Sequence, residues 1–163
     1  SRTDFLTGIA NRRGFDNHLH SVLADADRHG DTGVLVLIDL DHFKDINDTH
    51  GHEAGDMILR QVAKCLSTNV RLSDFVARLG GDEFAIVLSH TGPAEGIYRS
   101  RRLLTALEQI TVKHEHHTLR IQASIGVANY NSTASAKNLL HRADIAMYRH
   151  KRSKGLRFTR LAG

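Results

Sequence analysis

The sequence predicts an α/β fold with a mixed, largely antiparallel central sheet that is flanked by helices. Residues 34–40 form a continuous apolar run, which is typical of a buried central strand. Two short β-prone runs, 75–79 and 84–88, are separated by two glycines and two acidic residues. Because glycine accepts positive φ angles, this spacing predicts a tight hairpin. A direct hairpin excludes an all-parallel sheet.

The first half of the chain contains two segments with the apolar spacing of amphipathic helices. The first spans residues 12–28, and Asn11 before it is a candidate N-cap. The strand at 34–40 is followed by a stretch rich in Asp, Asn, His and Gly, which we expect to be a loop. The second helix presents its apolar face between Ile58 and Leu66.

The second half adds helices and a long strand after the hairpin. Pro93 suits a helix start, and that helix should run to about Gln109. Apolar residues alternate over 119–127, which predicts a strand with one buried face. A further helix face lies within 139–147, and a short strand is expected at 156–158. The expected element order is α-β-α-β-β-α-β-α-β.

Composition bounds the class of protein. The chain has 163 residues, 40% of them hydrophobic, which predicts one soluble globular domain over residues 1–163. No apolar run reaches the roughly 20 residues of a membrane span. Cys65 is the single cysteine, so no internal disulfide forms. The first residue is Ser rather than Met, from which we expect a piece of a longer protein.

The basic residues are concentrated near the C-terminus. Six of the 22 Lys and Arg residues lie in 149–160, which contains no acid, leaving 16 basic against 18 acidic residues elsewhere. A domain that binds a nucleic-acid polymer should be basic along a whole face, so the distribution argues against one. The basic segment at 149–160 is compatible both with a local phosphate-binding site and with a solvated tail.

Acidic residues cluster at two predicted strand ends. Asp39 and Asp41 end the run at 34–40, and the period of two puts both on one face. If the hairpin pairs beside that strand, Asp82 and Glu83 converge on Asp39. Clustered carboxylates repel unless a cation neutralises them, and hard oxygen ligands suit Mg²⁺ bound with substrate phosphates. Solvated carboxylates are the alternative; the clustered arrangement is the one nucleotidyl transfer requires.

Polar residues that could bind a nucleotide follow the first strand. Lys44 could hold phosphate charge in a transition state. The segment 47–56 offers carboxylates that can accept from guanine N1–H and its amino group, donors that adenine lacks. A polar loop with helix-capping residues is the alternative for this segment.

Together these segments resemble the GGDEF domains, the diguanylate cyclases. Residues 78–84, Arg-Leu-Gly-Gly-Asp-Glu-Phe, are similar to the family signature. Five more segments are similar to family motifs in the same order, namely 4–15, 39–48, 51–56, 124–128 and 143–151. The resemblance covers nearly the whole chain and implies a fold like nucleotidyl cyclase and polymerase palm domains.

The resemblance also implies roles for matched residues. The metal ligands would be Asp39, the Leu40 carbonyl, Asp82 and Glu83. The catalytic residues would be Asp82, Glu83 and Lys44, with the identity of the base open between the two acids. The substrate-binding residues would be Asn47, His52, Asp56, Gly80, Gly81 and Lys151.

The reaction implied is condensation of two GTP into cyclic di-GMP with release of two pyrophosphates. Mg²⁺ is the expected cofactor, with Mn²⁺ as the alternative ion. Each domain would bind one GTP, so catalysis needs a homodimer of domains. A sensory or dimerising region would precede this chain. The domain is expected in the cytoplasm, because GTP is found there. Whether the full-length protein is soluble or membrane-tethered stays open.

Another matched motif implies product inhibition. Arg71 and Asp74 form an R-x-x-D motif that is followed by five residues and then Gly80, a spacing that marks the inhibitory product site in the family. Arg102 stands where the family would have a further basic ligand. Arginine can bind phosphate or guanine through paired hydrogen bonds.

The chain departs from the family after Lys151, where a glycine usually stands three residues on and a basic residue follows. Here Lys154 stands three on and Gly155 four on. The second phosphate-binding base is therefore open among Lys154, Arg152 and Arg157.

Two other functions compete with the cyclase interpretation. A catalytically silent domain could bind GTP or cyclic di-GMP and regulate a partner. Another nucleotidyl cyclase or a relative of the polymerase palm domains is the second alternative, and turnover of ATP in preference to GTP would support it. Residues 114–117, His-Glu-His-His, are expected in an exposed loop, and their spacing does not favour a zinc site.

Overall fold

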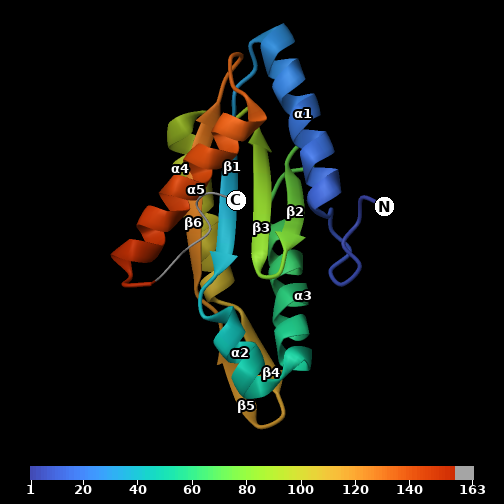
Figure 1. The fold of residues 1–163 in the computed structure, drawn as a ribbon, viewed down its shortest axis with the longest axis vertical. Helices are drawn as coiled ribbons and strands as arrows, with labels where there is room; N and C mark the ends of the chain where they lie inside the picture. The colour runs from blue at the N-terminus through green and yellow to red at the C-terminus, as the bar shows by residue number, and fades with distance from the viewer. Residues whose placement is uncertain (157–163) are drawn as a thin grey trace.

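The computed structural model describes residues 1–156. It confirms the predicted α/β fold with an antiparallel central sheet flanked by helices (Figure 1). The elements in chain order are α1 (Arg12–His29), β1 (Gly33–Leu40), α2 (Phe43–His50), α3 (His52–Thr68), β2 (Phe75–Gly80), β3 (Glu83–Ser89), α4 (Pro93–Glu108), β4 (Thr111–His114), β5 (His117–Arg120), β6 (Ala123–Tyr130) and α5 (Ala136–Ser153).

The main sheet has four strands in the order β2-β3-β1-β6. Its neighbouring strands are antiparallel, and an isolated parallel bridge joins Ala10 to Ala77 beside β2. All eight residues of β1 are buried, as the continuous apolar run predicts. Across the ladder Asp39 lies opposite Glu83 on β3 and opposite Ser124 on β6. This register brings the end of β1 to the turn of the β2–β3 hairpin.

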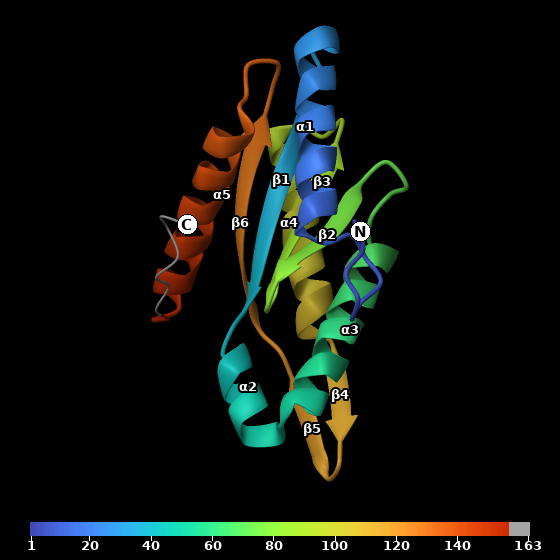
Figure 2. The same ribbon diagram turned by 45° about the vertical axis from the view of Figure 1, so that its right-hand side comes forward.

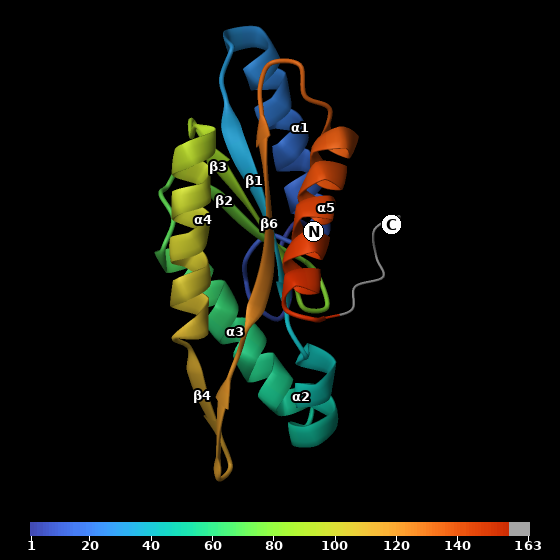
Figure 3. The ribbon, with the colours of Figure 1, turned by 90° about the vertical axis from the view of Figure 1, so that its left-hand side faces the viewer.

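Helices cover both faces of the sheet. Seen along the sheet edge in Figure 3, α4 lies on one side and α1 and α5 lie on the other. Val36 and Ile38 of β1 pack in the core with α3 and α4, whereas Leu35 and Leu37 pack in the core with α1 and α5. Burying each such side chain contributes about 1.5–3 kcal/mol. Asp39 continues the second series, so it ends the face that α5 covers.

A glycine lets α5 approach β6 closely. A Cβ at Gly126 would lie 2.0 Å from the carbonyl oxygen of Ala143 on α5, so a larger residue would push the helix away.

The N-terminal cap of α1 is as predicted, because Asn11 accepts a hydrogen bond from Gly14 N at 2.9 Å. Pro93 likewise begins α4. Among residues 1–156, no helix combines the length and apolar character that crossing a bilayer requires.

The prediction of a loop after β1 is wrong, because residues 43–50 form the helix α2. This helix has two turns and a polar sequence, so its periodicity is weak. Phe43 is buried, and Ile46 packs against the same core. Contact with α3 therefore stabilises a helix that local sequence does not signal.

The exposed loop expected at 114–117 is confirmed only in part: residues 115 and 116 form an exposed turn, whereas His114 and His117 belong to strands. These residues belong to the β4–β5 hairpin, whose turn holds Glu115 at φ 54°. The strand expected over 119–127 is in fact the end of β5 and the start of β6. Leu119, Ile121 and Ala123 are all buried, so the alternation continues although the partner strand changes.

Figure 2 shows α2, the start of α3 and the β4–β5 hairpin gathered at one end of the molecule. The short strand expected at 156–158 lies outside the described residues except for Leu156, which is in no strand.

Candidate active site

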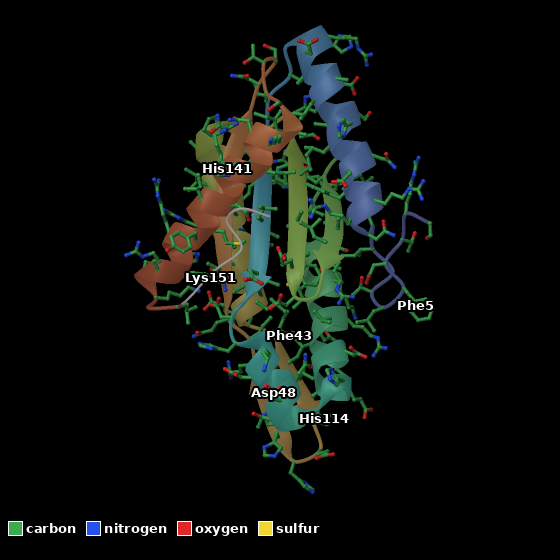
Figure 4. All side chains as sticks on the ribbon, viewed as in Figure 1. Phe5, Phe43, Asp48, His114, His141 and Lys151 are labelled. Carbon is green, nitrogen blue, oxygen red and sulfur yellow. The ribbon has the colours of Figure 1, made fainter. Side chains whose placement is uncertain are left out.

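A buried lysine bridges two carboxylates at the end of β1. Lys151 Nζ lies 3.0 Å from Asp39 Oδ2 and 3.2 Å from Asp41 Oδ1. Figure 4 shows Lys151 on α5 beside the end of β1. Burial alone would lower the pKa of Lys151, but the two carboxylates raise it, so the ammonium stays charged. The close packing of α5 on Gly126 helps to place this residue at the sheet end.

Asp41 has the most enclosed carboxylate of the site, with no exposed side-chain surface. Its Oδ1 accepts from Ser124 Oγ at 2.8 Å, and its Oδ2 accepts from Lys154 Nζ at 2.7 Å. Burial would raise the pKa of Asp41, but the hydrogen bonds from Lys154 and Ser124 lower it below its usual value. Asp41 is therefore held as a carboxylate.

The hairpin turn brings a second pair of acids to the end of β1. Asp82 O accepts a hydrogen bond from Leu40 N at 3.2 Å, and Glu83 lies opposite Asp39. Burial, the charge of Asp39 and a hydrogen bond between the two carboxyls raise the pKa of Asp82 to about 6. The structure thus gathers Asp39, Leu40, Asp82 and Glu83 at one place.

The two glycines of the turn have the backbone that the hairpin needs. Gly80 has φ 142° and Gly81 has φ 52°, values that side chains rarely allow. A Cβ at either position would meet no atom within 4 Å, so the space beside the turn is open to a ligand.

The donor set suits Mg²⁺ better than a transition metal. Within residues 1–156, no three or more His, Cys, Asp or Glu side chains are grouped as a ready metal centre. The carboxylates of Asp39 and Asp82 instead form a mutually repelling pair, beside a cationic lysine. A pair of hard oxygen ligands fits Mg²⁺, which takes the remainder of its coordination from water and substrate phosphates.

Residues expected to bind guanine come from α2 and α3. Asn47 packs on Gly55 so closely that a Cβ there would lie 1.9 Å from Asn47 Oδ1. Asn47 Oδ1 is buried and accepts no hydrogen bond from the described residues. Asp56 follows Gly55 directly, and His52 is exposed at the start of α3. Buried polar atoms are usually hydrogen-bonded, so Asn47 Oδ1 is available to accept a hydrogen bond from a ligand.

Lys44 is placed differently from the other site residues. Its side chain is 87% exposed on α2 and pairs with Asp48, with 2.8 Å between Nζ and Oδ2. Figure 4 shows Asp48 on α2, below the end of β1 where Lys151 lies. Because the Lys44 ammonium is paired with Asp48, a role on a phosphate requires its side chain to leave Asp48.

Two of the three predicted product-site residues line an open groove of about 1010 Å³ between the end of α3 and α4. Arg71 and Arg102 lie on its wall, together with Arg99 and Tyr98. Arg71 Nη2 pairs with Glu95 Oε1 at 2.8 Å.

Asp74 does not line that groove. Its carboxylate has no exposed surface, accepts from Arg71 N at 2.8 Å and pairs with Arg99. In this structure Asp74 therefore fixes the loop that carries Arg71, and Arg99 emerges as a residue that the sequence analysis missed. The sequence feature that could have pointed to Arg99 is the group of basic residues at 99–102 on one helix.

An N-terminal residue is tied to the hairpin turn. Arg78 Nη1 lies 3.2 Å from Asp4 Oδ1, and Arg78 Nη2 donates to Gly81 O at 2.8 Å. Thr7 Oγ1 donates to Asp4 Oδ2 at 2.6 Å. The first residues of the chain therefore help to fix the turn that carries Asp82.

An antiparallel sheet with acids at the end of its central strand and in the adjoining hairpin turn defines an α/β domain of the nucleotidyl cyclase class. The family model described as "Diguanylate cyclase, GGDEF domain" matches residues 1–157. The chain belongs to the GGDEF family.

Proteins similar to this chain carry the same family's activity in their names. Diguanylate cyclase A of Treponema denticola is 33% identical over 162 residues, which are 96% of this chain and 43% of that protein. Diguanylate cyclase DosC of Escherichia coli is 39% identical over 150 residues, which are 91% of this chain and 33% of that protein. The chain thus spans less than half the length of these relatives.

Solved structures match the fold. Diguanylate cyclase SiaD of Pseudomonas aeruginosa, solved with its activator SiaC, has a TM-score of 0.90 and 33% identity, covering 94% of this chain and 59% of that chain. The GGDEF domain of DgcB from Caulobacter crescentus, solved in complex with cyclic di-GMP, has a TM-score of 0.89 and 33% identity, covering 94% and 91%.

Proposed function

We propose that this chain is a diguanylate cyclase domain that condenses two GTP into cyclic di-GMP and releases two pyrophosphates. The observation that carries the proposal is the contact between the Asp39 and Asp82 carboxyls at the end of β1, where Asp39 also lies opposite Glu83 and beside Lys151. Paired carboxylates can hold the metal ion that nucleotidyl transfer uses, and a neighbouring lysine can stabilise the charge of the reacting phosphates. The names of the family's similar members support the same reaction.

Asp39, the Leu40 carbonyl, Asp82 and Glu83 would hold Mg²⁺, with Mn²⁺ as the alternative ion. A bound Mg²⁺ would supply positive charge to the triphosphate and lower the barrier to attack at the α-phosphate. Lys151 would exchange its carboxylates for the terminal phosphates. Lys44 would reach the triphosphate from α2 on release from Asp48.

Guanine selectivity would come from Asn47 and Asp56. The unsatisfied Asn47 Oδ1 can accept from a guanine N–H, and Asp56 can accept from the N1–H and amino edge. Adenine offers no donor at the N1 position, so buried acceptors would stay unpaired with ATP. His52 lies near these residues at the start of α3. Gly80 and Gly81 leave space for the nucleotide at the hairpin turn.

Catalysis would require two copies of the domain. Each copy would hold one GTP, and the 3′-hydroxyl of one nucleotide would attack the α-phosphate of the other. Asp82 or Glu83 would take the hydroxyl proton, and pyrophosphate would leave from the attacked phosphorus. The second bond forms in the same way with the two roles exchanged, which closes the ring.

The groove at Arg71 and Arg102 would bind the product and inhibit the enzyme. Arg71 would give up Glu95 for a phosphate or guanine of cyclic di-GMP, and Arg102 would add a second guanidinium. Asp74 would act by holding the Arg71 loop. The likeness to the DgcB domain solved with cyclic di-GMP supports binding of that dinucleotide. The cytoplasm is the proposed location, because GTP is available there.

The proposal is tested by incubating concentrated protein with GTP and Mg²⁺ and separating the products by chromatography. Cyclic di-GMP from GTP, with none from ATP or without metal, is the expected result. A chain joined to a dimerising coiled coil that binds cyclic di-GMP but forms none would support a silent binding module instead. Turnover of ATP in preference to GTP would support another nucleotidyl cyclase.

A further inference from the structure

We propose that Lys154 is a positioning residue that holds the charge of Asp41, so that Lys151 can leave the carboxylates for the triphosphate of GTP. The inference rests on the proposed function and deepens it, because it concerns how the same site receives its substrate. It concerns the segment where this chain departs from the family pattern after Lys151.

Asp41 is shared between the two lysines. Its Oδ1 is 3.2 Å from Lys151 Nζ and 2.8 Å from Ser124 Oγ, whereas its Oδ2 is 2.7 Å from Lys154 Nζ. The side chain of Asp41 has no exposed surface. Each carboxylate oxygen therefore already has its own ammonium.

Lys151 has a second carboxylate to leave, because its Nζ also lies 3.0 Å from Asp39 Oδ2. If Asp39 binds a metal ion and Lys151 binds phosphate, Lys151 must move away from both acids. Without another cation, Asp41 would keep only the Ser124 hydroxyl, which satisfies an oxygen but does not neutralise the charge. A buried carboxylate in that state strongly resists losing its lysine.

The contacts of Lys154 can keep it on Asp41 when Lys151 moves away. Its backbone N–H donates to the carbonyls of Lys151 and Arg152 at the end of α5, which anchors the residue to the helix. Its Nζ donates to the backbone carbonyl of Ala123 at 2.7 Å as well as to Asp41. Gly155 follows with φ 75°, a left-handed conformation that ends the helix there.

These contacts also bear on the second phosphate-binding base. The Lys154 ammonium already has two acceptors from the protein, and its side chain is 29% exposed. A lysine in this position acts on phosphate through Lys151 rather than by touching it. Of the remaining two candidates, Arg152 is exposed and stands over the Tyr148 ring, 5.8 Å from its centroid. Arg157 lies outside the described residues.

The test compares variants by calorimetric binding of α,β-methylene GTP with Mg²⁺, which needs no turnover. Lys154→Met should weaken binding about tenfold, a loss of roughly 1.4 kcal/mol, because Lys151 stays on Asp41. Lys154→Arg should bind within about threefold of the parent, since it keeps the charge. Asp41→Asn/Lys154→Met should also recover to within about threefold, because the neutral amide no longer holds Lys151.

Arg149→Met is the matched control, since it removes one positive charge from the exposed side of the same helix. It should bind the analogue within about twofold of the parent. The double variant also serves if Lys154→Met fails to fold, because it lacks the buried carboxylate that would have lost one of its two ammonium partners.

Two results would overturn the inference. Equal binding by Lys154→Met and the parent would show that Lys154 does not influence the site. A double variant as weak as Lys154→Met would show that Lys154 contacts phosphate directly. A parent chain that does not bind the analogue would instead reject the proposed function, and the inference with it.

Discussion

Lys151 Nζ lies 3.0 Å from Asp39 Oδ2, so a helix at the end of the chain neutralises an acid at the end of the central strand. Both side chains are largely buried, with exposed fractions of 7% and 11%. The contact closes α5 over the place where the hairpin turn meets β1.

Replacing Lys151 by Met should destabilise the protein without ligand by about 3 kcal/mol, because Asp39 loses a buried partner. The free energy of unfolding from denaturant titration measures this loss. Lys137→Met, on an exposed position of the same helix, should change it by no more than about 0.5 kcal/mol. A Lys151→Met protein as stable as the Lys137→Met control would mean that the ion pair carries no structural weight.

The raised pKa of Asp82 predicts a pH dependence of stability. Burial, then the charge and hydrogen bond of Asp39, raise the folded-state pKa to about 6. An unfolded Asp ionises near about 3.9, so between these values the folded state binds more protons than the unfolded state. The free energy of unfolding should therefore fall as pH rises from about 4 to about 6 and then level off.

The Asp82→Asn variant should lack this contribution to the pH dependence of the free energy of unfolding. The informative quantity is the difference in unfolding free energy between Asp82→Asn and the parent at each pH, because histidines titrate in both proteins. The difference should grow in favour of the variant as pH rises towards about 6. Parallel curves would show that Asp82 ionises normally and that the two carboxyls do not interact.

The tie between Arg78 and Asp4 should stabilise the hairpin turn. Their side chains are only 15% and 17% exposed, and Arg78 also holds the Gly81 carbonyl. Arg78→Met should cost about 2–3 kcal/mol and speed hydrogen exchange at the Leu40 amide, which bonds to Asp82. Arg12→Met breaks the exposed Arg12–Asp16 pair and should cost less than about 1 kcal/mol. Equal costs for the two variants would contradict this account.

The groove arginines should govern binding of the product. Arg71→Ala and Arg102→Ala should each weaken cyclic di-GMP binding by about tenfold to a hundredfold, because each removes a charged hydrogen-bond donor. Calorimetric titration with cyclic di-GMP measures the effect, with the exposed Arg120→Ala on β5 as the control. If Arg71→Ala binds the dinucleotide as the Arg120→Ala control does, the groove is not the product site.

Hydrophobic periodicity was enough to predict most of the fold. The apolar run at 34–40 identified the central strand, and the glycines at 80–81 identified the hairpin. Periodicity could not reveal α2, because Phe43 and Ile46 stabilise it through tertiary packing. Nor could it locate the break between β5 and β6, since burial alternates across that break.

The site was predictable where strand register decides it. Asp39, Asp82 and Glu83 could be expected to converge once the hairpin was paired with the first strand. The bond of Lys154 to Asp41 could not be foreseen, because it depends on the packing of α5 against β6 at Gly126. The burial of Asp74 likewise depends on Arg99, a residue of the following helix.

The most direct test of the central claim is cyclic di-GMP production by the chain joined to a dimerising coiled coil, with GTP and Mg²⁺, for the parent and for Asp39→Asn. The proposed site predicts product from the parent and a loss of at least about a hundredfold in Asp39→Asn, a variant that keeps the shape of the side chain. Product from Asp39→Asn at the parent rate would contradict the assignment of this carboxylate cluster as the active site.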